Sequence, residues 1–137
     1  MTQPPAVEFA FPGPLRDSLV ETVLDGKKTS TTGLVADYTA SGDPIPAVGY
    51  RFSVIDSSGK PVGVIEVTGV RIVRLADVSL DHAMAEGEGH RSIADWRRGH
   101  ESFWHSTEMR SALGDPTFTV DDDTKVVLES FRLIQPR

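Results

Sequence analysis

The chain has 137 residues, of which 39% are hydrophobic and 25% are charged, and these values suit one compact globular domain. Lys and Arg total 14 against 20 Asp and Glu, and the resulting net charge of −6 argues against a protein that coats nucleic acid non-specifically. Cysteine is absent, which excludes disulfides and thiol chemistry. No apolar run approaches the roughly 18 residues of a membrane-spanning helix, and no signal-peptide pattern is seen, so we expect a cytoplasmic protein without a membrane partner.

The first part of the chain is predicted to form a tail and a helix. Residues 1–10 carry proline without any periodicity and are expected to be a flexible N-terminal tail, and residues 11–137 are expected to form a single domain. Pro14 suits the first turn of a helix in which apolar residues recur every four positions. Gly26 follows as a helix stop, so the helix should end directly before residues 26–31, which we name the Lys-Thr segment.

A loop and a hairpin are predicted next. Residues 37–49 are rich in glycine, aspartate and proline and are predicted to be a loop. Residues 50–55 and 61–75 alternate polar and apolar side chains on either side of a tight turn. This pattern predicts an antiparallel β-hairpin with one buried face.

The second half of the chain is predicted to contain two helices and then closing strands. Ser79 is expected to begin a short helix that ends at the Glu-Gly repeat of residues 86–89, and Ser92 a longer one. Residues 118–120 and 126–134 are predicted to be strands. This order of elements predicts an α+β fold, with a small mixed or antiparallel β-barrel flanked by about three helices.

The Lys-Thr segment concentrates ammonium and hydroxyl groups, which donate hydrogen bonds to anions and carbonyls. In an extended strand, Lys27, Thr29 and Thr31 would share one side, and Lys28 and Ser30 the other. A catalytic pair of Lys28 and Thr31 therefore requires a turn or bulge between them. From composition alone, an exposed lysine-rich turn before a threonine-rich strand is the simpler interpretation.

The Glu-Gly repeat and the following helix supply further candidates. Glu86 or Glu88 could be a general base, and the alternative is an acidic helix end that glycine closes, although the helix dipole disfavours a carboxylate there. His100 lies on an apolar helix face, where a core histidine is the simpler interpretation. Arg97 and its neighbours could bind phosphate or only form a solvated face. The histidines lack metal-ligand spacing, so no structural zinc is expected.

Together these features resemble the ASCH domain family, which is related to the PUA domain of RNA-modifying proteins. The matching residues are 26–31, Pro46, Val48, Gly49, 66–68, 86–89, Ser92, Trp96, Arg97, His100, Phe103, 126–127 and 129–131. The resemblance covers nearly everything from Leu15 to Ile134. It implies a PUA-like barrel with a cleft for RNA or a modified nucleoside, without DNA specificity, cofactor or metal.

The family contains small amidohydrolases that remove the acetyl group of N4-acetylcytidine, and proteins reported as ribonucleases. In the amidohydrolase branch the catalytic set is a lysine, a threonine three residues later and a glutamate from the second helical region. The resemblance places these roles on Lys28, Thr31 and Glu86, with Glu88 as the competing carboxylate. Gly33 stands where that branch usually has an arginine.

The predicted function is accordingly an RNA- or nucleoside-directed hydrolase, either a ribonuclease or an amidohydrolase. The alternative is a noncatalytic RNA-binding module of the PUA-like type. Contacts with the substrate are expected from the side chains that surround the proposed catalytic set. These are Lys27, Thr29, Ser30, Glu88, Arg97 and His100.

Overall fold

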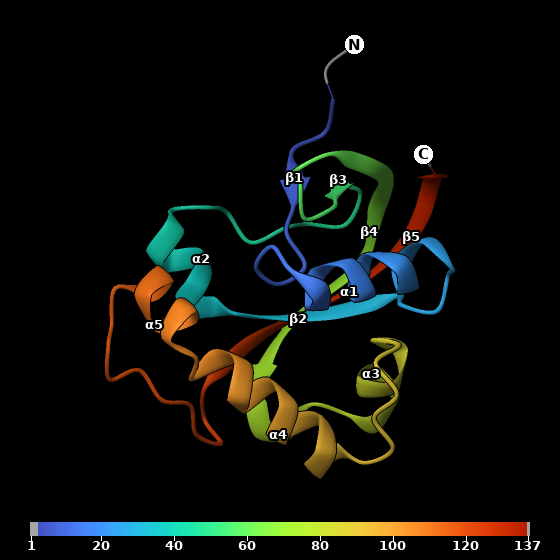
Figure 1. The fold of residues 1–137 in the computed structure, drawn as a ribbon. Helices are drawn as coiled ribbons and strands as arrows, with labels where there is room; N and C mark the ends of the chain where they lie inside the picture. The colour runs from blue at the N-terminus through green and yellow to red at the C-terminus, as the bar shows by residue number, and fades with distance from the viewer. Residues whose placement is uncertain (1–2, 137) are drawn as a thin grey trace.

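The computed structural model describes residues 3–136, and its centre is a five-stranded sheet with the order β1-β3-β4-β5-β2 (Figure 1). The strands are β1 (Ala6–Val7), β2 (Ser30–Leu34), β3 (Arg51–Ile55), β4 (Pro61–Arg74) and β5 (Lys125–Pro136). Strand β1 pairs in parallel with β3, and the other neighbours are antiparallel. The ladder between β4 and β5 shifts register at two places, and such irregularities increase strand bending and twist. The sheet curls into a half-barrel.

Helices surround this half-barrel. They are α1 (Pro14–Leu24), α2 (Val35–Ser41), α3 (Leu80–Ala85), α4 (Ile93–Trp104) and α5 (Thr107–Leu113), with a 3-10 turn at Leu75–Asp77. The predicted α+β class is confirmed. The structure has five α-helices within residues 3–136, where about three were expected, because α2 and α5 are short and were not predicted. The side chain of Ser79 caps α3 and that of Ser92 caps α4, as their positions in the sequence predicted.

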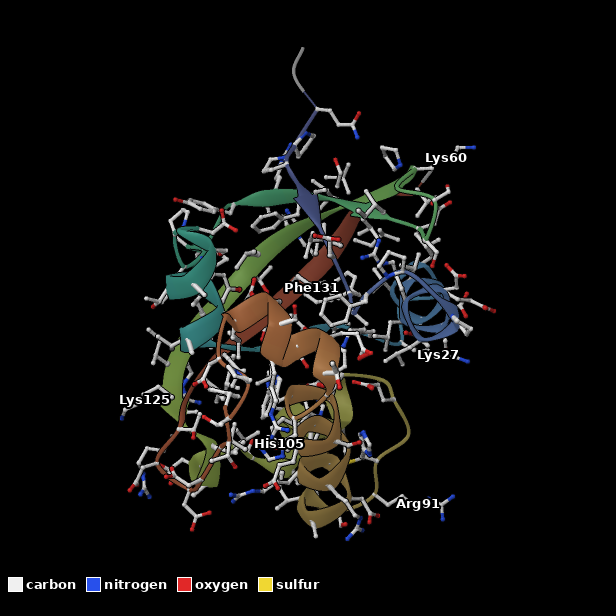
Figure 2. The ribbon with its side chains drawn as sticks, turned by 60° about the vertical axis from the view of Figure 1, so that its left-hand side comes forward. Lys27, Lys60, Arg91, His105, Lys125 and Phe131 are labelled. Atoms are coloured by element: carbon white, nitrogen blue, oxygen red, sulfur yellow. The ribbon has the colours of Figure 1, made fainter. Side chains whose placement is uncertain are left out.

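Two apolar clusters hold the elements together. One packs α1 and the N-terminal segment against β3, β4 and β5, and Phe131 of β5 lies within it (Figure 2). The other packs α3, α4 and α5 against the opposite end of the sheet around Trp96 and Trp104, which are 1% and 2% exposed. Strand β2 passes between α1 and α3 (Figure 1), and its last residue, Leu34, belongs to the second cluster.

The segment before α1 differs from the flexible tail that the sequence predicted. Ala6 and Val7 pair with Ser53 and Val54 of β3, and Phe9 is only 4% exposed. The apolar side chains of this segment fill the cluster beside α1, and this burial outweighs the absence of periodicity. Residues 1 and 2 of the expected tail lie outside the described residues.

Two further local predictions are wrong. Residues 37–41 of the predicted loop form most of α2, which ends at Gly42 in the left-handed conformation with φ of 75°. Residues 118–120 are not a strand, because Val120 donates its backbone N–H to Nε2 of His105 instead of to a neighbouring strand. The predicted hairpin of β3 and β4 and the closing strand β5 are confirmed.

Candidate active site

A cavity of about 570 Å³ lies between β2, the N-terminal segment, α2 and α4. Its apolar wall contains Phe9, Phe11, Phe103 and Trp104. Its polar lining gathers residues that are far apart in the sequence. They are Glu8, Lys28, Thr31, Thr32, Asp37, Tyr38, Glu86, Glu88, His90, His100 and Glu129.

Lys28 enters this cavity because the chain turns sharply after α1. Gly26 adopts a φ of 79°, and the backbone N–H groups of Lys27 and Lys28 both donate to the carbonyl of Thr22 at 3.0 Å. The side chain of Lys28 is 2% exposed, and its Nζ donates to the backbone carbonyls of Ser30 at 2.9 Å and Glu86 at 3.3 Å. Burial lowers the pKa of Lys28, although the charges of Glu86 and Glu88 oppose this shift.

Gly87 allows the Glu-Gly repeat to approach Lys28 this closely. Its φ is 72°, and a Cβ atom at this position would lie 2.7 Å from the carbonyl oxygen of Lys27 and 3.0 Å from the nitrogen of Lys28. Real Cβ atoms do not tolerate such distances to backbone, and L-residues with a side chain disfavour this φ. Glycine is therefore required where the two segments meet.

Glu86 is 1% exposed and surrounded by donors. Its Oε2 accepts a hydrogen bond from Oγ1 of Thr32 at 2.5 Å and lies 3.3 Å from Nε2 of His82, and its Oε1 lies 3.0 Å from Nε2 of His100. Burial alone would raise the pKa of Glu86, but hydrogen bonds from His100 and His82 hold it well below its usual range. Glu86 is an ionised anchor whose two oxygens are already engaged.

His100 completes this buried network. Its Nδ1 lies 3.0 Å from the carbonyl oxygen of Trp96, which can only accept a hydrogen bond, and its ring stacks on that of Trp96 at 4.3 Å between centroids. Nε2 faces the carboxylate of Glu86, so both ring nitrogens act as donors in an imidazolium. Burial would lower the pKa of His100, but the hydrogen bond to Glu86 and the charges of Glu86 and Glu88 outweigh it and raise this pKa.

Glu88 differs from Glu86 because it is accessible from the cavity. Its side chain is 24% exposed, and its Oε2 lies 3.9 Å from Nζ of Lys28. Burial raises the pKa of Glu88, the charge of Lys28 opposes this shift, and the negative charge of Glu86 raises the pKa further. Of the two carboxyl groups that the sequence left as alternatives, Glu88 has the geometry to meet a ligand.

Glu86, Glu88 and His100 could also be considered as metal ligands, since one ligand atom of each lies within 4.8 Å of the others. Carboxylate and imidazole groups suit several divalent cations. However, the oxygens of Glu86 already accept hydrogen bonds from protein donors, and Nζ of Lys28 lies beside Glu88. The arrangement fits an ion-pair network of protein groups better than a cation site.

Thr31 lies on β2 and lines the cavity together with Lys28 and Glu86. Within residues 3–136 its hydroxyl makes no hydrogen bond to either side chain, and the next residue, Thr32, is the one that binds Glu86. In the ladder Thr31 is paired with Glu129 of β5. The structure therefore brings the three predicted catalytic residues to one cavity without joining them in a hydrogen-bonded triad.

The residues expected to contact substrate divide into two groups. Glu88 and His100 line the cavity. Lys27 is exposed and points to solvent (Figure 2), and Arg97 is engaged by Glu101 at 2.6 Å and Asp122 at 2.5 Å. The hydroxyls of Thr29 and Ser30 donate to the carbonyls of Ala85 and His82, so they fasten β2 to α3. These four residues lie outside the cavity lining.

Sequence reasoning missed four residues of the site: Thr32, Tyr38, His82 and Glu129. The spacing of His82 and Glu86 carried a signal, because residues four apart on a helix share a face. Tyr38 and Glu129 are 91 residues apart and meet through a hydrogen bond of 2.9 Å. Only the folded sheet brings them together, so no local pattern could have revealed the pair.

A curled, largely antiparallel half-barrel with flanking helices and a polar cavity beside an edge strand defines a small α+β domain. The model of the ASCH domain matches residues 8–135. The chain belongs to the ASCH domain family. No helix in the described part of the chain is long and apolar enough to span a membrane.

Solved structures agree with this assignment. The ASCH domain of Lactobacillus crispatus JV V101 is 30% identical, with a TM-score of 0.81 over 98% of this chain and 81% of that one. A protein of Enterococcus faecalis V583 is 23% identical, with a TM-score of 0.85 over 99% of this chain and 79% of that one. ASCH from Zymomonas mobilis shares the fold at 13% identity, with a TM-score of 0.52 over 87% and 64% of the two chains. A search of curated proteins finds no match.

Proposed function

We propose that this ASCH domain hydrolyses an amide bond of a small uncharged ligand, and that an N-acylated nucleoside such as N4-acetylcytidine is the substrate class. The observation that carries the proposal is the buried Lys28 amine, held beside Glu88 in a cavity that Thr31 also lines. The choice of substrate follows the family resemblance, which assigns catalysis to a lysine, a threonine and a glutamate in this order.

The charge of the cavity favours a nucleoside over an RNA strand. Five carboxyl groups line it, from Glu8, Asp37, Glu86, Glu88 and Glu129, against the amine of Lys28 and the imidazolium of His100. A phosphate group would meet repulsion from these acids, which is strong in a partly desolvated site. An uncharged base or acylated amine meets no such penalty. Amide hydrolysis is therefore preferred to ribonuclease chemistry.

Lys28 is suited to act as the base. Two of its N–H groups are used by the carbonyls of Ser30 and Glu86, so in the neutral amine the lone pair remains for the substrate. Burial lowers the pKa of Lys28, which increases the neutral fraction. A threonine hydroxyl is a weak nucleophile without such a base.

In the proposed reaction, Oγ1 of Thr31 attacks the acyl carbon and its proton passes to Nζ of Lys28. The tetrahedral intermediate then breaks its C–N bond, and Lys28 returns the proton to the leaving nitrogen. Water attacks the resulting ester, and its proton passes through Lys28 to Oγ1 of Thr31 as the acid is released. Glu88, at 3.9 Å from Nζ, stabilises the ammonium formed in each half of the reaction.

The test offers N4-acetylcytidine and, separately, labelled single-stranded RNA to the purified protein. We expect release of acetate and cytidine and no cleaved RNA. Lys28→Ala should remove the activity, and the matched control Lys27→Ala should keep it because Lys27 is exposed outside the cavity. Full activity of Lys28→Ala would refute the proposed mechanism. Cleavage of RNA alone would indicate a ribonuclease, and binding without product a noncatalytic module.

A further inference from the structure

A second polar group lies in the cavity, formed by Tyr38 of α2 and Glu129 of β5. The hydroxyl of Tyr38 donates to Oε2 of Glu129 at 2.9 Å. Glu129 is 8% exposed, and within residues 3–136 no lysine, arginine or histidine forms an ion pair with it. Both residues line the cavity. The mechanism proposed for amide hydrolysis uses neither of them.

Burial of a carboxyl group that has a single hydrogen-bond partner destabilises the folded state. Transfer of such a group from water is unfavourable without compensating hydrogen bonds. Burial raises the pKa of Glu129, and the hydrogen bond from Tyr38 opposes this only in part. Its other oxygen, Oε1, accepts no hydrogen bond from the side chains of residues 3–134, so it is free to meet a molecule in the cavity.

Tyr38 and Glu129 both lie beside β2. Gly33 lies on β2 beside Tyr38, and a Cβ atom there would stand 3.4 Å from Cε2 of the tyrosine ring. This is an ordinary van der Waals distance, so the ring of Tyr38 packs directly against β2. Glu129 is in turn the ladder partner of Thr31, and directly opposed residues have Cβ atoms about 5 Å apart. The side chains of Glu129 and Thr31 therefore lie on the same face of the sheet.

We propose that the Tyr38–Glu129 pair recognises an N–H group of a planar, uncharged heterocyclic amide or base and places it beside Thr31. The carboxyl oxygen of Glu129 accepts the N–H, and Tyr38 fixes the carboxyl orientation. In naming this ligand as the substrate, the inference rests on the proposed hydrolase function, but ligand recognition can be measured without turnover.

The rest of the cavity suits such a ligand. Phe11 and Phe103 stack on each other at 5.7 Å between ring centroids and form an aromatic wall. Aromatic walls bind flat heterocycles through stacking and exclude water. Asp37, which also lines the cavity, adds a carboxyl group that disfavours anionic ligands. Together these features select a flat molecule with hydrogen-bond donors and without negative charge.

The experiment measures binding of cytidine, N4-acetylcytidine and cytidine monophosphate by calorimetry, with tryptophan fluorescence as a second readout, since Trp104 lines the cavity. We expect Glu129→Gln to weaken binding of the two nucleosides by about tenfold or more and Tyr38→Phe to weaken it less. The monophosphate should bind more weakly than cytidine. The matched controls Glu101→Gln and Tyr50→Phe alter residues outside the cavity and should bind as the wild type does.

The outcomes separate this inference from the proposed function. Wild-type affinity in Glu129→Gln, or no binding of any nucleoside, would overturn the inference even if N4-acetylcytidine is hydrolysed. Binding that depends on Glu129 without any hydrolysis would support the inference and overturn the hydrolase. If Glu129→Gln does not fold, Tyr38→Phe decides, because it removes one hydroxyl and keeps the ring; unchanged affinity there would count against the pair.

Discussion

Replacing Gly87 by alanine tests how the site is assembled, because this residue lies where the Glu-Gly repeat meets the Lys-Thr segment. The added Cβ would stand 2.7 Å from the carbonyl oxygen and 2.9 Å from the carbonyl carbon of Lys27. These are backbone atoms and cannot rotate away. The two segments must move apart, and the amine of Lys28 must move away from the carbonyl of Glu86 that it now binds at 3.3 Å.

The size of the effect can be estimated by comparison with Gly89. Both glycines have positive φ, 72° for Gly87 and 82° for Gly89, but a Cβ on Gly89 would meet nothing within 4 Å. Gly89→Ala should therefore cost only the conformational strain, about 1–2 kcal/mol. Gly87→Ala adds a steric clash that typically costs about 1–3 kcal/mol more. The difference between the two variants isolates the clash.

Urea unfolding of the two variants and the wild type measures this difference directly. We expect Gly87→Ala to be the less stable variant by more than about 1 kcal/mol and to lose most hydrolysis of N4-acetylcytidine. Gly89→Ala should keep the activity. Equal losses of stability in the two variants would refute the close approach of these segments.

Three further predictions concern the buried network and the cavity wall. Glu86→Gln should lower the free energy of unfolding by about 3 kcal/mol near pH 6, measured by urea unfolding. Because the pKa of Glu86 is lowered by folding, this loss should shrink as pH falls below 4.5, and a constant loss would contradict the network. Folding raises the pKa of His100, so the pH dependence has the opposite sign. The protonated ring stabilises the fold fully below pH 6.5, and this stabilisation is lost as pH rises through the folded pKa. His100→Asn should therefore lower the free energy of unfolding least at high pH. Arg16→Met should lower the melting temperature, because Arg16 is 2% exposed and donates two hydrogen bonds to the carbonyl of Ala10, a residue with φ of 66°. An unchanged melting temperature would show that these hydrogen bonds do not stabilise the fold.

The sequence predicted those parts of the fold that depend on local pattern. Alternating apolar residues predicted the hairpin of β3 and β4, and capping serines predicted where α3 and α4 begin. It did not predict α2, since this short helix leads directly into residues 42–49, where two glycines and two prolines indicate a loop. It also gave no sign that Phe9 is buried, because a short segment takes its structure from the cluster into which it packs.

The candidate site shows the same division. The clustering of Lys28 with the Glu-Gly repeat followed from the family-like order of motifs, and the structure places these residues around one cavity. Which carboxyl group is accessible could not be read from the sequence, since it depends on His82 and His100 enclosing Glu86. The Tyr38–Glu129 pair depends on the register of the sheet, which is a long-range property.

The most direct test of the central claim is the rate of N4-acetylcytidine hydrolysis by the wild type, Lys28→Ala and Lys27→Ala under identical conditions. The two lysines are adjacent in the sequence, but only Lys28 is buried in the cavity. We predict turnover by the wild type and by Lys27→Ala, and a loss of at least about a hundredfold in Lys28→Ala, as is usual when a general base is removed. Equal rates for the two variants, or no turnover by the wild type, would contradict the account.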